Sequence, residues 1–167
     1  MLMFSKPKFL LSIIIALPCF LHAQDSINFP SIGEVLRFDK QMDSLVASDA
    51  KIEVISSGFT WSEGPVWVKE GNFLLFSDVH RNKVIKWTEG VGAETFLEPS
   101  GFTGIGHYST GLGSNGLAID AAGRLISCEH GDRRISAMTF KEGKVTLTDN
   151  YNGKRFNSPN DLAISKN

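Results

Sequence analysis

Cysteine, excess basic charge and long apolar runs are all scarce in this sequence. Its 167 residues include two cysteines, and only Cys128 lies beyond the N-terminal apolar segment. A single cysteine excludes an internal disulfide. The chain carries 17 basic and 18 acidic side chains with no basic stripe, which argues against nucleic acid as a partner.

Several common catalytic motifs are missing too. The sequence contains no Gly-x-Ser-x-Gly elbow, which argues against an α/β-hydrolase with a serine nucleophile. It also contains no phosphate-binding loop and no dinucleotide fingerprint. Any catalysis must therefore use a different constellation of residues.

Residues 1–23 have the pattern of a signal peptide. Lys6 and Lys8 precede an apolar run at 9–21, which is short for a membrane span, and Ala23 supplies a small residue for cleavage. Removing this segment leaves 15 basic and 18 acidic side chains, a net charge of −3. We therefore expect a secreted or periplasmic protein without a stable membrane span.

The most informative positive feature is an internal repeat. Residues 62–76 align without a gap with residues 114–128, at an offset of 52 positions, and a third copy begins near Ser158 and continues to Ser165. Short apolar runs that repeat at this spacing indicate a β-propeller or a related array. The expected fold class is all-β, with a partial propeller at 51–167 and a short helical lead-in at 24–50.

Each full repeat contains four candidate strands separated by turn residues. Those of the first blade are 65–69, 73–77, 83–87 and 94–97, and those of the second are 117–120, 124–129, 133–140 and 145–148. A further strand is expected at 52–56, and the first strand of a third blade at 160–165. The glycine-rich segment 99–113 between the blades is expected to form a wall or lid of the channel.

The repeat places polar residues at one equivalent position, namely Glu63, Asn115 and Asn160. In a radial array, equivalent positions converge on the axis. A carboxylate with two amide oxygens suits a hard metal ion. Further polar residues follow the second strands and are expected at the same rim: Asp78, His80, Glu129, His130 and Asp132.

A propeller needs at least about four blades to close. The sequence predicts two blades and the first strand of a third. We therefore expect the chain to be the N-terminal part of a longer protein.

Three motifs together closely resemble the gluconolactonases of the senescence-marker-protein-30 group. They are Trp61-Ser62-Glu63-Gly64-Pro65-Val66-Trp67, Cys128-Glu129-His130-Gly131-Asp132-Arg133-Arg134 and Asn157-Ser158-Pro159-Asn160-Asp161-Leu162. The resemblance implies a six-bladed propeller with a divalent metal in its central channel, Ca²⁺ first, with Zn²⁺, Mg²⁺ and Mn²⁺ as alternatives. It also implies metal-assisted hydrolysis of a sugar lactone.

Carried over residue by residue, the resemblance makes Glu63 and Asn160 metal ligands. Asn115, His107 and His130 become candidates for binding substrate. The catalytic Asp expected from the family lies beyond Asn167. Two alternatives stay open: a non-catalytic ligand-binding propeller, and a related propeller hydrolase acting on aryl esters or organophosphates.

Overall fold

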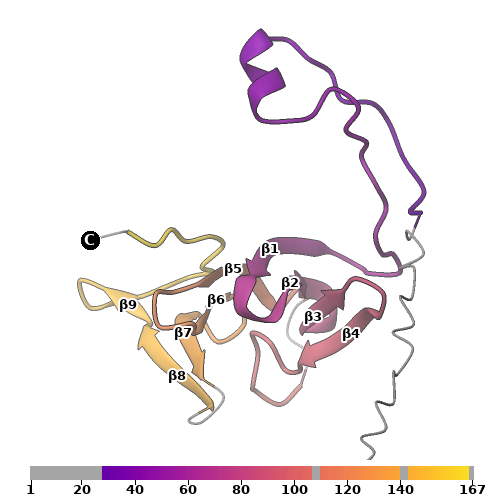
Figure 1. Cartoon of the computed structure of the whole chain (residues 1–167). Helices are drawn as coiled ribbons and strands as arrows, with labels where there is room; N and C mark the ends of the chain where they lie inside the picture. The colour runs from indigo at the N-terminus through magenta and orange to yellow at the C-terminus, as the bar shows by residue number, and fades with distance from the viewer. Residues whose placement is uncertain (1–27, 107–109, 140–142, 166–167) are drawn as a thin grey trace, which may run out of the picture.

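The computed structural model describes residues 28–106, 110–139 and 143–165 as two four-stranded antiparallel sheets and a small hairpin (Figure 1). The first sheet contains β1 to β4, which are Ser62–Val68, Phe73–Asp78, Lys83–Thr88 and Gly92–Leu97. The second contains β5 to β8, which are Ser114–Ile119, Leu125–Glu129, Arg134–Thr139 and Gly143–Thr148. The hairpin pairs β9, Asn150–Tyr151, with β10, Lys154–Arg155.

Strands that follow one another in sequence are neighbours in both sheets, as they are in propeller blades. The prediction of an all-β chain containing part of a propeller is therefore confirmed. We call the two sheets blade one and blade two.

The turns of blade one use left-handed asparagines. Asn72 ends the 3₁₀ turn η2, Lys69–Gly71, with φ 52°, and Asn82 ends η3, Val79–Arg81, with φ 55°. Asparagine tolerates this conformation better than most residues. Asn82 also caps the start of the glycine-rich segment, because its side-chain oxygen accepts hydrogen bonds from three successive backbone amides, those of Ser100, Gly101 and Phe102.

A β-bulge lies near the start of each first strand. The register shifts between Glu63 and Val66 in blade one, and between Ser114 and Leu117 in blade two. Both strands begin three residues earlier than predicted, because the residues before the bulge still pair with the second strand. A bulge re-aims the side chains beside it, and both bulges fall on the repeat position of the candidate site.

The two blades are joined by an apolar core. Leu75 and Val84 of blade one pack with Leu117 and Leu125 of blade two, and all four are buried. Burying one such side chain stabilises the fold by about 1.5–3 kcal/mol. The core therefore fixes how the first strands of the blades lie relative to each other.

The segment before β1 covers the other face of blade one. Phe29, Ile55 and Phe59 pack on the buried cluster that contains Phe76 and Trp87. The Trp87 indole donates a hydrogen bond of 3.1 Å to the backbone oxygen of Ile55. This part of the chain is therefore held by blade one, although it adds no strand to its sheet.

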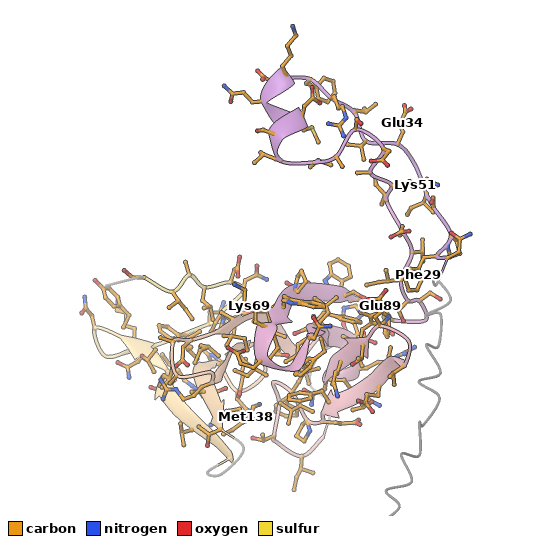
Figure 2. All side chains as sticks on the ribbon, in the orientation of Figure 1. Phe29, Glu34, Lys51, Lys69, Glu89 and Met138 are labelled. Carbon is orange, nitrogen blue, oxygen red and sulfur yellow. The ribbon has the colours of Figure 1, made fainter. Side chains whose placement is uncertain are left out.

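The strand predicted at 52–56 is reduced to one isolated bridge between Ser31 and Glu53. In the described part of the lead-in, residues 28–50, the helical element is the short 3₁₀ helix η1, Lys40–Ser44. Gly33 and the bonds of Arg37 to Asp43 and to the backbone oxygen of Val46 favour a looped arm. Figure 2 shows Glu34 on this arm, away from the blades, and Phe29 at their edge.

Residues 160–165 form no strand, although a first strand of a third blade was predicted there. A strand is defined by ladder hydrogen bonds, and no described segment lies beside these residues as a second strand. Across 28–106, 110–139 and 143–165, no helix is long and apolar enough to cross a membrane. The predicted signal peptide lies outside these residues.

Candidate functional site

The three repeat copies meet where their first strands begin. A Cβ atom on Gly64 would lie 2.4 Å from the Asn115 backbone oxygen, and one on Gly116 would lie 2.6 Å from Asp161 Oδ1. The Gly116 amide donates a 2.8 Å hydrogen bond to the Asn160 backbone oxygen. Each copy therefore touches the next, and only glycine permits such close contact at positions 64 and 116.

Asn115 is the most tightly held of the three polar residues at this position. Its side chain is buried, and its amide nitrogen donates a 2.9 Å hydrogen bond to the Pro159 backbone oxygen. Its backbone oxygen accepts a 2.8 Å bond from the Ser77 hydroxyl, which also contacts the Ser114 hydroxyl at 2.8 Å. Asn115 thus links blade one, blade two and the third copy, and its amide has a fixed orientation.

Glu63 is half-buried beside the first bulge, opposite Ser77 in the β1–β2 ladder. One of its carboxylate oxygens accepts a 3.2 Å hydrogen bond from the Trp61 indole. The residue also lines a cavity of about 220 Å³ together with Pro65 and Phe76. Its carboxylate is therefore oriented by the protein while remaining accessible.

Asn160 and Asp161 are both exposed, at the start of the third copy. Burial raises the pKa of the Cys128 thiol to about 11, and the negative charges of Asp161 and Glu63 add to this rise. Two carboxylates from different repeat copies thus act on one buried thiol. The sequence interpretation missed Asp161; the signal was an acidic side chain at the position that is glycine in the other two copies.

Two of the carboxylates expected at the rim have structural roles instead. Asp78 is fully buried and accepts hydrogen bonds of 3.1 Å from the backbone amides of Thr60 and Trp61. Glu129 is also fully buried, and it pairs with Arg134 at 2.6 Å and Lys144 at 2.7 Å. The partners of Asp78 lie in the segment that leads into β1 and those of Glu129 lie in blade two, so both carboxylates are engaged in structural contacts.

Asp132 forms hydrogen bonds to the glycine-rich segment. Its carboxylate accepts hydrogen bonds from the Thr103 amide at 3.0 Å and the Thr103 hydroxyl at 2.8 Å. Together with Asn82, it ties residues 100–103 between the blades. This arrangement gives Asp132 a structural reason for its position, and the role of the segment as a wall or lid of the channel stays a prediction.

The structure describes two of the three candidate histidines, His80 and His130. His80 stacks on Trp61, with ring centroids 5.5 Å apart and planes inclined by 25°. His130 is half-buried, and its backbone amide donates to the Gly113 oxygen at 3.3 Å. His107 lies outside the described residues. A substrate-binding role for His107, His130 and Asn115 stays a prediction.

The oxygen donors beside the contacts between the repeat copies are of the type that a hard divalent cation prefers. They are the carboxylates of Glu63 and Asp161 and the amides of Asn115 and Asn160. Within the described ranges, no group of three or more His, Cys, Asp or Glu side chains is placed to hold a metal. Amide oxygens must therefore contribute to any cation site here, and Ca²⁺, which takes 6–8 oxygens, would need additional ligands.

Comparison with known proteins gives the same family that the three sequence motifs resemble. Residues 61–167 match the SMP-30/gluconolactonase/LRE-like region. The chain is 42% identical over 148 residues to a gluconolactonase of Zymomonas mobilis subsp. mobilis, covering 86% of this chain and 41% of that protein.

Two solved structures are also similar. A gluconolactonase from Xanthomonas campestris aligns with a TM-score of 0.64 and 30% identity, over 84% of this chain and 42% of that one. An X-ray structure of another protein assigned as a gluconolactonase aligns with a TM-score of 0.61 and 29% identity, over 74% and 40%. The chain spans about two fifths of the length of these relatives.

Proposed function

This chain belongs to the SMP-30/gluconolactonase/LRE-like family, and we propose that it takes part in the hydrolysis of sugar lactones at the rim where its first strands begin. The observation that carries the proposal is the contact between successive repeat copies at Gly64 and Gly116. This contact joins the segments that carry Glu63 on β1, Asn115 on β5 and Asn160 in the third repeat copy. The relatives called gluconolactonases support the substrate class.

The proposal includes a divalent cation, for which Ca²⁺ is the first candidate. Held there, it would polarise the carbonyl of the lactone. Glu63 would supply negative charge to hold the cation, and Asn160 an amide oxygen. The negative charges of Glu63 and Asp161, which both act on Cys128, support this proposal because carboxylates are the ligands that a hard cation prefers.

Asn115 and His130 are proposed to bind the hydroxyl groups of the substrate. The bond to Pro159 orients the Asn115 amide before any ligand arrives. Such preorganisation lowers the entropic cost of binding a polar ligand. Secretion to the periplasm or the medium, directed by residues 1–23, remains part of the same proposal.

The test is Glu63→Gln, which keeps the size of the side chain and one oxygen but removes its charge. In the enzyme with its full set of blades, we expect hydrolysis of gluconolactone to fall at least about tenfold, roughly 1.4 kcal/mol in transition-state stabilisation, and to need more Ca²⁺ for half-maximal rate. The matched control is Glu70→Gln, in the exposed turn η2 at the far end of β1. Equal rates and equal Ca²⁺ dependence for the wild type and Glu63→Gln would remove Glu63 from the site.

A further inference from the structure

Trp61 is an exposed aromatic side chain held unusually firmly. More than half of it, 56%, is accessible to solvent, whereas Trp87 is only 8% accessible and fills the core. Its backbone is fixed at both ends: the Trp61 amide donates to Asp78 at 3.1 Å, and its oxygen accepts from the Val79 amide at 3.0 Å. Burial of its own surface does not explain why the residue is held in this way.

Its ring is held from one side. His80 stacks against it, and His80 in turn contacts the glycine-rich segment, where a Cβ on Gly111 would lie 3.1 Å from the imidazole. A side chain at Gly111 would have to displace this ring, and the backbone there has a positive φ of 81°. The glycine thus leaves room for the stacked pair at the wall between the blades.

The indole has a single hydrogen-bond donor, and Trp61 directs it to Glu63 Oε1 at 3.2 Å. One residue, Ser62, separates Trp61 from Glu63 in sequence, and the bulge of β1 begins at Glu63. A carboxylate on an exposed strand start can otherwise populate several rotamers. One donor fixed by the stack and the backbone restricts that choice.

We propose that Trp61 is a positioning residue for Glu63, and that His80 holds Trp61 in place. The Trp61 indole fixes the direction of the Glu63 carboxylate, and the stack couples that direction to the glycine-rich segment. The assignment rests on the role proposed above for Glu63. It adds a residue that acts through Glu63 and does not itself touch the cation.

The coupling is tested first without any metal. The chain has three tryptophans, Trp61, Trp67 and Trp87, so its proton–nitrogen NMR spectrum has three indole signals. In Glu63→Ala, the Trp61 indole proton should move upfield because it loses a charged acceptor, while the signals of Trp67 and Trp87 stay in place. An unmoved Trp61 signal would overturn the proposal.

The second measurement is Ca²⁺ affinity by calorimetry. Trp61→Phe keeps an aromatic ring against His80 but removes the donor, and we expect Ca²⁺ to bind about three- to tenfold more weakly. Trp67→Phe, near the far end of β1, is the matched control and should leave the affinity unchanged. In Glu63→Gln, adding Trp61→Phe should cause little further loss, since both act through one carboxylate.

The two proposals fail in different ways. A wild-type enzyme with its full set of blades that neither binds Ca²⁺ nor hydrolyses lactones would refute the proposed function, and the NMR result would still decide whether Trp61 holds Glu63. Equal Ca²⁺ affinity in the wild type and Trp61→Phe, with an active wild type, would refute the positioning role alone.

Discussion

Blade one and blade two end their second strands with the same feature, a fully buried carboxylate, yet they satisfy it by different means. Asp78 ends β2 and accepts mainly from backbone amides of the segment that leads into β1. Glu129 ends β6 and is surrounded by the charged groups of Arg134 and Lys144. A repeat thus preserves the position of a buried charge while leaving its partners free to change.

Asp78 and Glu129 therefore stabilise different parts of the molecule. Asp78 fixes the backbone of the residues that lead into β1. It is linked to the candidate site through Trp61, whose amide donates to it and whose indole contacts Glu63. Glu129 joins β6, β7 and β8 within blade two, with a further bond from the Ser136 hydroxyl. Lys144 extends this network to the backbone oxygen of Ser100, which lies between the blades.

The largest predicted effect is that of Glu129→Gln. It would leave Arg134 and Lys144, both largely buried, without their common counter-charge. Breaking a buried ion pair in this way costs about 3–5 kcal/mol. Chemical denaturation should show a loss of that order in the free energy of unfolding.

The matched control is Glu94→Gln in blade one, which removes an exposed carboxylate paired with Lys86 at 3.1 Å. An exposed pair contributes less than about 1 kcal/mol. Similar losses in Glu129→Gln and Glu94→Gln would show that the network of blade two does not depend on its charge.

An intermediate effect is expected for Asp78→Asn. The amide keeps one oxygen to accept from Thr60 and Trp61, so the hydrogen bonds weaken without being lost, and Arg81 at 3.6 Å is half exposed. We expect a loss of about 1–2 kcal/mol in the free energy of unfolding. A loss as large as that of Glu129→Gln would mean that the two blades depend equally on buried charge.

The smallest effect near neutral pH concerns Cys128, which directly precedes Glu129 in β6 as Ser77 directly precedes Asp78 in β2. Burial, with the charges of Asp161 and Glu63, raises the pKa of this thiol from 9.0 to about 11. In the unfolded chain the thiol loses its proton near pH 9, so the unfolded state binds fewer protons above that pH. Stability should therefore fall as the pH rises from about 9 to about 11.

Cys128→Ala should remove this pH-dependent step, apart from any uniform loss due to the smaller side chain. Denaturation of both proteins between pH 7 and 11 measures it. Alkylation of native Cys128 at pH 8 should also be slow, because the thiolate is the reactive form. Rapid alkylation of the folded chain, or an unchanged pH profile in Cys128→Ala, would contradict the raised pKa.

Periodicity and turn residues in the sequence were sufficient to predict the eight main strands and their grouping into two blades. The 52-residue offset likewise identified Glu63, Asn115 and Asn160 as equivalent positions. These features are local, since strand patterning and turns depend on neighbouring residues. The metal and substrate roles of these residues remain predictions, because no structural measurement here tests them.

Tertiary structure decided what local pattern could not. Residues 52–56 and 160–165 have strand-like sequences, yet a strand also needs a partner beside it, and these segments have none along most of their length. The buried positions of Asp78 and Glu129 and the stack of His80 on Trp61 depend on residues that are distant in sequence and brought together by packing. The sequence by itself determined the positions at which polar side chains recur. Tertiary packing determined which of these side chains are hydrogen-bonded or ion-paired to structural partners.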